Sequence, residues 1–166
     1  MTMNEAHEST TRLPEHAARM DWAKLAPEAF KALARLDWAA GRGVDSGLLH
    51  LVKVRASQIN HCAFCLDMHS KDALAAGESA ERIIQLAAWT EARHFYTARE
   101  AAAIELTEAI TVVTDGFVPD EVYARAAEHF DETELAHLVG AIVAINAFNR
   151  IGVSTRMVPG HYTPGS

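Results

Sequence analysis

The stretch SQINHCAFCLDMH, residues 57–69, holds both cysteines of the 166-residue chain, Cys62 and Cys65. On a helix, Cys62, Cys65 and His69 would fall within an arc of about 60° on one face. Because Cys65 and His69 are four residues apart, the imidazole would stack one turn beyond the thiol. The three-residue spacing of the cysteines would bring their Cα atoms within disulfide range. The segment therefore predicts a helix that presents two thiols and a base on one face.

The residues around the cysteines predict where this helix begins and ends. Asn60 suits the N-cap position and Gly77 suits the C-terminal stop, which gives a helix from His61 to Ala76. Both cysteines would then lie near the first turn, where the helix dipole and the free N–H groups favour a thiolate. A thiolate can attack an electrophilic oxygen to give a sulfenic acid, which a second thiol closes to a disulfide. The arrangement predicts a nucleophile, a base and a resolving thiol on a single helix.

Other interpretations of the two cysteines remain open at this point. Cysteine is often a small buried hydrophobic residue. A zinc site is a sharper alternative, because His61, Cys62, Cys65 and His69 are all possible ligands. Structural zinc sites normally draw ligands from two chain segments, however, and His50 is the only obvious distant candidate. A thioredoxin-like motif would need a βαβ context, and the surrounding sequence lacks it.

The composition predicts a mostly helical protein of one domain. Hydrophobic residues make up 49% of the chain and charged residues 22%, as in globular proteins. Good helix formers are abundant, β-branched residues are few, and no segment alternates like a strand. We expect a single-domain, all-α fold of about seven helices. Its predicted parts are a flexible N-terminal segment (1–12), the helical domain (13–156) and an extended tail (157–166).

Prolines, caps and glycines divide the helical domain into elements. Pro14 and Pro27 each suit the first position of a helix. Besides helix 61–76, the pattern predicts helices over 28–40, 47–57, 97–113 and 135–150, and shorter ones opening at Ser79 and Pro119.

Charge and hydropathy exclude several classes of protein. The formal net charge is −7 and the isoelectric point is near 5.7, so the chain should repel phosphate backbones and nucleic acid is not an expected partner. No uninterrupted apolar run approaches the ~18 residues of a membrane span. Residues 1–20 contain no apolar block of the kind found in secretory signals. We therefore expect a cytoplasmic protein.

The region from Leu48 to Gly77 resembles the carboxymuconolactone decarboxylase-like superfamily, and within it the alkylhydroperoxidase D-like (AhpD-like) branch. The specific signature is CAFCLDMH (62–69), which follows SQIN (57–60) after the single residue His61. Further matching stretches are DWAKLAPE (21–28), LVKVRA (51–56), KDA (71–73), WT (89–90), LTEA (106–109) and INAFNR (145–150). The resemblance therefore extends over most of the chain.

This resemblance implies an all-α fold that assembles as trimers or hexamers. It also implies a thiol-dependent peroxidase that needs neither a metal nor an organic cofactor. The partners would be a hydroperoxide substrate and an electron donor, either a dithiol or a disulfide reductase. By position in the motif, Cys65 would be the peroxidatic nucleophile, Cys62 would resolve it, and His69 would belong to the proton relay.

One position departs from the family pattern. The relay usually includes a glutamate twelve residues before the first cysteine, and this chain has His50 there. His50 could serve as the base, could indicate weaker peroxidase activity or another substrate, or could be an ordinary half-buried histidine. Two further functions also stay open, a thiol redox sensor without turnover and a lactone decarboxylase-like lyase.

Residues outside the motif carry weaker expectations. Glu108 matches a glutamate of the family and could approach the site from a neighbouring helix, but an ordinary salt-bridged surface glutamate is the favoured expectation. Asn146, Asn149 and Arg150, near the end of an apolar helix, are expected to form a subunit contact or a helix cap.

Overall fold

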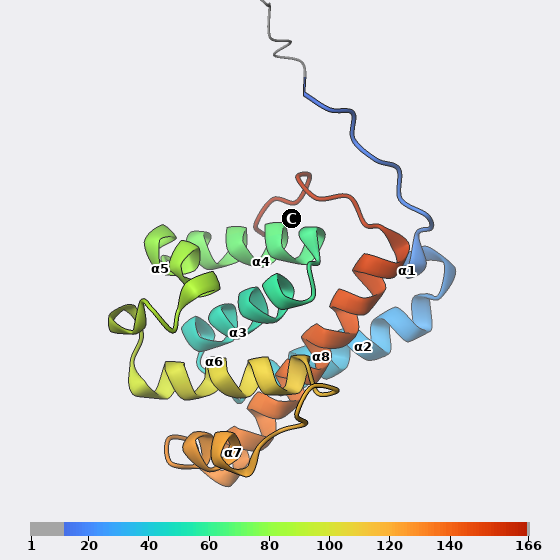
Figure 1. Ribbon diagram of the computed structural model, residues 1–166. Coiled ribbons are helices and arrows are strands. Elements are labelled where there is room, and N and C mark those ends of the chain that lie inside the picture. The colour runs from blue at the N-terminus through green and yellow to red at the C-terminus, as the bar shows by residue number, and fades with distance from the viewer. Residues whose placement is uncertain (1–11, 166) are drawn as a thin grey trace, which may run out of the picture.

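The computed structural model describes residues 12–165, and within this range the chain is helical without any strand (Figure 1). The predicted all-α fold is confirmed. Residues 1–11 of the N-terminal segment expected to be flexible, and Ser166 of the expected tail, lie outside the described residues. The α-helices are α1 (Trp22–Leu25), α2 (Pro27–Gly41), α3 (Ser46–Ile59), α4 (Ala63–Ala75), α5 (Ala80–Gln85), α6 (Ala98–Thr111), α7 (Asp120–Ala127) and α8 (Glu132–Thr155), with 3₁₀ turns at Leu86–Ala88 and Arg93–Phe95.

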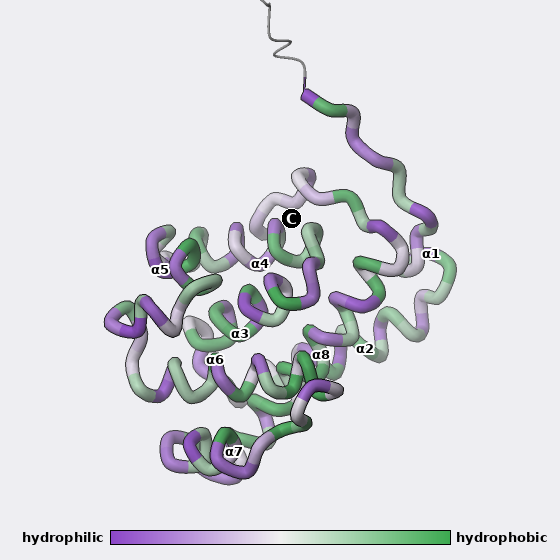
Figure 2. Tube along the Cα trace, viewed as in Figure 1, coloured by the Kyte–Doolittle hydropathy of each residue, from purple (hydrophilic) through white to green (hydrophobic). Residues whose placement is uncertain are grey.

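Helix α8 organises the core, because α2, α3, α4, α6 and α7 all pack against it. A capping box at Asp131 and Glu134 starts the helix. Its residues Leu138, Ile142 and Ile145 are fully buried, and hydrophobic residues recur along α3 and α8 in Figure 2. By length and mean hydropathy alone α8 could cross a membrane. Its packing among five other helices is that of a core helix.

The turn between α3 and α4 differs from the sequence prediction. Asn60 is the C-cap of α3, and Cys62 is the N-cap of α4, so the expectation that Asn60 caps α4 was wrong. The Asn60 side-chain nitrogen is held by two buried acceptors on α8, and Cys62 Sγ accepts the backbone N–H of Cys65 as the cap instead. His61, between the two helices, has a φ of +53°. Gly77, with a φ of +94°, follows α4 as predicted.

Other helices also begin or end at residues that differ from the sequence prediction. No helix starts at Pro14; the segment from there to Met20 is irregular and exposed, since it has no apolar stripe to bury. Pro27 does begin α2. The helix that opens at Ser79 is short and tightens into a 3₁₀ turn. Helix α8 continues beyond Arg150 to Thr155.

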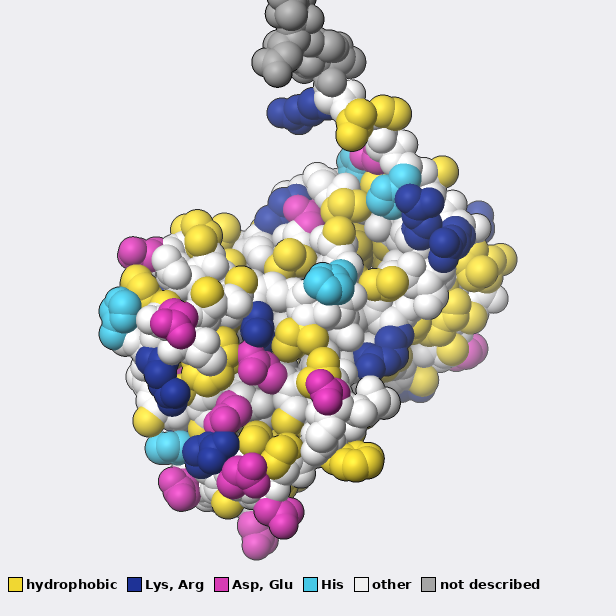
Figure 3. Space-filling view, viewed as in Figure 1, with side chains coloured by type: hydrophobic (Ala, Val, Ile, Leu, Met, Phe, Trp, Pro, Cys, Tyr) yellow, Lys and Arg dark blue, Asp and Glu magenta, His cyan; other side chains and the backbone are white. Residues whose placement is uncertain are grey.

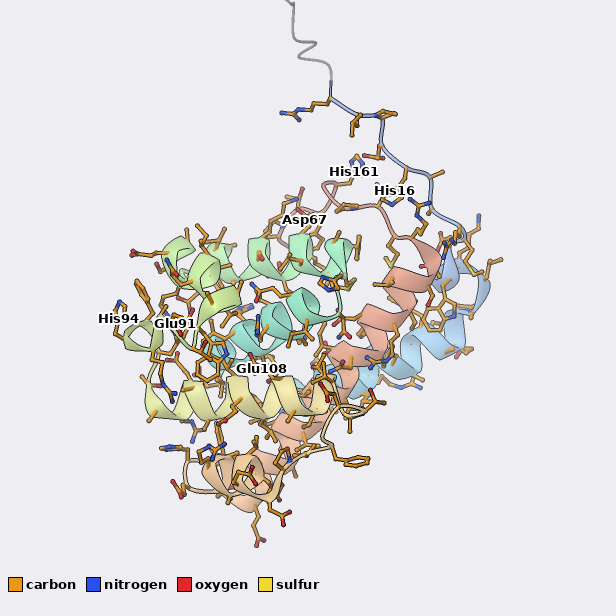
Figure 4. The ribbon with its side chains drawn as sticks, in the orientation of Figure 1. His16, Asp67, Glu91, His94, Glu108 and His161 are labelled. Carbon is orange, nitrogen blue, oxygen red and sulfur yellow. A yellow bond between two sulfur atoms is a disulfide. The ribbon has the colours of Figure 1, made fainter. Side chains whose placement is uncertain are left out.

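The segment that leads into α1 and the segment that follows α8 lie close to each other, and the latter continues over α4 (Figure 1). The backbone N–H of Arg19 donates to the carbonyl of Thr155 over 2.7 Å. On the C-terminal side, the backbone N–H of Gly160 donates to Asp67 Oδ2 on α4 over 3.0 Å. Figure 4 shows Asp67 on the side of α4 that faces this tail. Both end segments are thus attached to the helices that surround the cysteines.

Candidate active site

The two cysteines are disulfide-bonded at the N-terminus of α4, with Cα atoms 5.4 Å apart. This confirms the predicted placement of the Cys-x-x-Cys pair at a helix start. Cys62 Sγ also caps the helix, because the backbone N–H of Cys65 donates to it over 3.3 Å. Both cysteines are buried, with exposed fractions of 2% for Cys62 and 3% for Cys65. Free N–H groups at a helix start stabilise negative charge on sulfur, so the position suits a thiolate once the pair is reduced.

Helix α8 approaches the sulfurs at Gly152. A Cβ atom at this position would lie 2.8 Å from Cys62 Sγ and 3.5 Å from Cys65 Sγ. Only glycine allows this approach without a shift of either helix. Gly152 was not among the residues predicted for the site, although a glycine inside an otherwise apolar helix is a signal of close packing.

A buried network of side-chain amides fixes the turn before Cys62. The Asn60 amide donates to Asn146 Oδ1 and to Asn149 Oδ1, each over 2.9 Å. The Asn149 amide in turn donates to Ser57 Oγ over 3.0 Å. Arg150 donates back to the carbonyl and side chain of Asn146, one turn earlier in α8. Asn146 and Asn149 are buried and join α8 to the α3–α4 turn, so they form neither a subunit contact nor a helix cap, whereas a subunit contact through the exposed Arg150 stays a prediction.

An apolar cavity of about 650 Å³ opens beside the cysteine pair. Cys65 and His69 line it, whereas Cys62 does not. Its apolar wall comes from α1, α2, α4 and α8 and includes Trp22, Phe30, Phe64, Met68, Phe148 and Ile151. Cys65 is therefore the sulfur that a molecule in the cavity would meet.

The environment of His69 keeps its imidazole neutral. The side chain is buried on α4. Burial, reinforced by the positive charge of Lys53 and by His50, lowers the pKa of His69 to about 3. A neutral imidazole at the cavity wall can accept a hydrogen bond or a proton from a neighbouring thiol.

His50 lies on α3, near His69 but not on the cavity wall. Partial burial lowers its pKa, and Lys53 acts in the same direction. The carboxylates of Asp72 and Glu78 oppose this shift. The structure thus brings together the four residues singled out in the sequence, with His50 behind His69 rather than beside the cavity.

An ion pair between two helices lies next to these histidines. Lys53 Nζ on α3 is 2.7 Å from Asp37 Oδ2 on α2. Asp37 lines the cavity, and its Oδ1 is buried without a hydrogen-bond partner among the described residues. The pair places a carboxylate on the wall and a cation close to His69. No spacing rule links residues from two different helices, so this contact needed the fold.

Glu108 lies on α6, away from the cavity wall (Figure 4). Its Oε1 is 2.7 Å from Arg55 Nη2 and accepts a 2.7 Å hydrogen bond from Trp89 Nε1. The expected salt bridge is present, but its partners are half-buried rather than fully exposed. Glu108 therefore joins α6, α3 and the 3₁₀ region and does not approach the sulfurs.

The zinc alternative finds no support in the part of the chain that the structure describes. Across residues 12–165, no group of three or more histidine, cysteine, aspartate or glutamate side chains is placed to hold a metal ion.

Fold and site together define an all-helical protein with an AhpD-like arrangement, in which a Cys-x-x-Cys pair starts a helix beside an apolar cavity. The chain belongs to the carboxymuconolactone decarboxylase family, whose profile matches residues 27–109. The resemblance inferred from the sequence is thus confirmed.

Two relatives from bacteria are themselves uncharacterized. YdfG of Bacillus subtilis (strain 168) is 41% identical over 137 residues, which cover 82% of this chain and 92% of YdfG. YnjA of Escherichia coli (strain K12) is 33% identical over 100 residues, which cover 58% of this chain and 54% of YnjA. Their similarity establishes kinship without assigning an activity.

Two crystal structures share the fold. ATU0492 from Agrobacterium tumefaciens, a protein of unknown function proposed to be the antioxidant defence protein AhpD, superposes with a TM-score of 0.84. It is 36% identical, and the match covers 88% of this chain and all of that one. The alkylhydroperoxidase AhpD core of an uncharacterized peroxidase-related protein from Ralstonia eutropha JMP134 has a TM-score of 0.72 at 17% identity, covering 84% and 74% of the two chains. The latter similarity concerns the fold alone.

Proposed function

We propose that the protein is a thiol-dependent peroxidase that reduces organic hydroperoxides through Cys65. The observation that carries this proposal is the asymmetry of the cysteine pair. Cys65 and His69 line the apolar cavity, while Cys62 lies behind Cys65 at bonding distance. A nucleophile at the cavity wall with a resolving thiol directly behind it is the arrangement that a two-cysteine peroxidase requires.

The proposed reaction has two steps. The Cys65 thiolate attacks the terminal oxygen of the hydroperoxide, the O–O bond breaks, and the alkoxide takes up the proton that the thiol released, leaving as an alcohol. Sulfur is oxidised to a sulfenic acid as the peroxide is reduced. Cys62 then attacks the Cys65 sulfur, and its proton leaves with the sulfenic hydroxyl as water. An external dithiol or a disulfide reductase supplies the two electrons and two protons that restore the thiols.

His69 is the residue we assign to proton transfer. It follows Cys65 by one helical turn and lines the same cavity. Its low pKa belongs to the disulfide form, in which no charged sulfur lies beside it. A Cys65 thiolate would raise that pKa, so in the reduced protein the imidazole can take the thiol proton and return it to the alkoxide. His50 and Lys53 flank His69 from α3 and tune its basicity. In this assignment His50 acts on His69 and not on the substrate.

The name of one structural relative supports this direction. It is proposed to be an antioxidant defence protein, and it is 36% identical to this chain. No metal or organic cofactor takes part in the proposed cycle.

A homo-oligomer, a trimer or hexamer, belongs to the same proposal. Hydrophobic side chains gather over α1 and α2 on the right of Figure 3. The exposed hydrophobic residues of these two helices include Leu25, Leu36 and Trp38, the last with 64% of its surface exposed. Apolar surface of this kind is typical of subunit interfaces. A monomer mass in sedimentation would remove this part of the proposal, and the cytoplasmic location remains a prediction.

The test compares two serine variants in steady-state peroxide consumption with a dithiol donor. Cys65→Ser should abolish consumption, because it removes the nucleophile. Cys62→Ser should allow one oxidation, which a sulfenic-acid trapping reagent would detect on Cys65, and then stop. Turnover at the wild-type rate in both variants would reject the proposal.

The same two variants, with an added product assay on a muconolactone, separate the remaining functions. A redox sensor would form the disulfide but show no sustained turnover with any dithiol. A lyase would convert a muconolactone in both serine variants, since that chemistry does not need the cysteine pair.

A further inference from the structure

We propose that the Lys53–Asp37 ion pair controls the charge at the nucleophilic sulfur: the Lys53 ammonium group favours the Cys65 thiolate, and the Asp37 carboxylate limits this effect. Both are positioning residues in this assignment, because they act through their charges. The inference deepens the proposed function and rests on it, since it names the groups that prepare the nucleophile. Three features carry it: the place of the ion pair, its burial, and the small number of other charges around the site.

The ion pair joins two helices that surround the site. Asp37 extends from α2 to the wall of the cavity that Cys65 and His69 also line. Lys53 extends from α3, and its Nζ is 2.7 Å from Asp37 Oδ2. The positive charge of Lys53 acts on the imidazole of His69, where it lowers the pKa. A charge that disfavours a cation at His69 favours an anion at Cys65, one helical turn before it.

Burial distinguishes this ion pair from one at the surface. The side chains of Lys53 and Asp37 are 12% and 25% exposed, whereas those of Lys31 and Glu28 on α2 are 61% and 81% exposed. Water and salt screen buried charges less than exposed ones. Asp37 Oδ1 is buried without a hydrogen-bond partner among the described residues, so Lys53 is the group that balances this carboxylate. Removal of either partner therefore leaves an uncompensated charge beside the site.

The cavity wall itself supplies no cation. No lysine or arginine lines it, and its carboxylates are those of Asp37 and Asp21. Asp21 Oδ1 accepts the backbone N–H of Lys24 and so caps α1. Helix α8 and the segment after it contribute apolar side chains to the wall, namely Phe148, Ile151, Met157 and Val158. Positive charge can therefore reach the sulfur only from behind the wall.

Behind the wall, Lys53 is the cation that acts on His69. The other titratable group on α3, His50, is half-buried, and burial together with Lys53 lowers its pKa. The carboxylates of Asp72 and Glu78 act on His50 and oppose this shift. The pKa of His69 responds to Lys53 and His50 and to neither of these carboxylates. Lys53 is thus the group whose charge the site depends on.

The first test measures the ionisation of Cys65 and needs no peroxide. In a Cys62→Ser background Cys65 is the single thiol of the chain, and the ultraviolet absorbance of its thiolate is followed against pH, with Cys62→Ser/Cys65→Ser protein as the baseline. Lys53→Met should raise the midpoint of this titration by about one pH unit, the scale on which one nearby charge acts. Asp37→Asn should lower the midpoint, because Lys53 then keeps its charge without its partner. A merely structural role would move both midpoints in the same direction.

Two control variants accompany this titration. Lys31→Met removes the lysine of the exposed ion pair on α2 and should leave the midpoint unchanged. Lys53→Arg keeps the positive charge and should keep the wild-type midpoint. The inference is overturned if Lys53→Met leaves the midpoint unchanged, or if Asp37→Asn does not lower it.

A double variant covers the case in which a single variant does not fold. Lys53→Met/Asp37→Asn removes both charges and leaves neither buried alone. The pKa of His69 responds to Lys53 and not to Asp37, so the loss of the cation should dominate and the midpoint should lie above that of the wild type. An unchanged or lower midpoint in the double variant would overturn the inference.

The second test separates this inference from the proposed function. It measures the first oxidation of fully reduced protein by cumene hydroperoxide at a pH below the midpoint. The rate should fall roughly threefold in Lys53→Met, because a tenfold smaller thiolate fraction is partly offset by the greater nucleophilicity of a more basic thiolate. Midpoints that shift as expected without thiol oxidation in any protein would support the inference and reject the peroxidase. Unshifted midpoints with wild-type oxidation rates would overturn the inference and leave the peroxidase proposal in place.

Discussion

The contact between α8 and the cysteine pair gives a prediction of defined size. In Gly152→Ala the new methyl group would lie 2.8 Å from Cys62 Sγ, well inside the ~3.5–4.0 Å of an optimal non-bonded contact. Forcing an extra methyl group into a packed core costs about 1–3 kcal/mol. Replacing glycine by alanine inside a helix returns about 1 kcal/mol. We therefore expect the free energy of unfolding to fall by about 1 kcal/mol and the melting temperature by about 2–4 °C.

A double-mutant cycle isolates the contact with sulfur. In Cys62→Ala the atom that clashes is gone, while Cys65 Sγ stays at an ordinary 3.5 Å from the new methyl group. Adding Gly152→Ala to this background should raise the free energy of unfolding by about 1 kcal/mol, because only the helix propensity remains. Urea denaturation of the four proteins under non-reducing conditions provides the values. The reasoning is refuted if Gly152→Ala has the same effect in both backgrounds, or if it stabilises the wild-type protein.

Three further predictions concern residues around the site. The pKa of His69 is about 3 in the folded protein and near 6.5 in the unfolded chain, so the unfolded chain binds more protons between these pH values. Acidification through this window therefore lowers the free energy of unfolding by up to about 1.4 kcal/mol per pH unit. In His69→Gln, urea titrations over the same window should show a smaller slope, and an unchanged slope would contradict the assigned shift. Asn149→Ala removes one buried partner from the amide of Asn60 and one from the hydroxyl of Ser57, and should lower the free energy of unfolding by about 2–4 kcal/mol. A loss below about 0.5 kcal/mol in chemical denaturation would show that water replaces the network. Glu108→Ala leaves the buried Trp89 N–H without its acceptor and should lower the free energy of unfolding by about 1–3 kcal/mol, while the single-turnover rate of thiol oxidation stays at the wild-type value. A drop in that rate would show that Glu108 takes part in the chemistry.

The fold was predictable wherever the information is local. Capping boxes at Thr97 and Asp131, Pro27 at a helix start and Gly77 after a helix all acted as their residue types predict. Predictions failed where tertiary partners intervened. Asn60 has the chemistry of an N-cap, but the buried acceptors on α8 engage its amide. Pro14 suits a helix start, yet no apolar stripe follows it.

The site was predictable along one helix but not between helices. Cys62, Cys65 and His69 lie in one continuous stretch of sequence, so their spacing alone predicted that they would be close together, as they are in the structure. The cavity draws its wall from α1, α2, α4, α8 and both chain ends, and the Lys53–Asp37 pair joins two helices. Such contacts depend on how helices cross, which no periodicity in a single sequence specifies.

The central claim is that Cys65 reacts with a hydroperoxide and Cys62 resolves it. The most direct measurement is the intact mass of the reduced protein, followed over time after one equivalent of cumene hydroperoxide. The account predicts a rapid loss of about 2 Da, which corresponds to the two hydrogens released when the sulfenic acid condenses with the second thiol. An unchanged mass, with both thiols still open to alkylation, would contradict it.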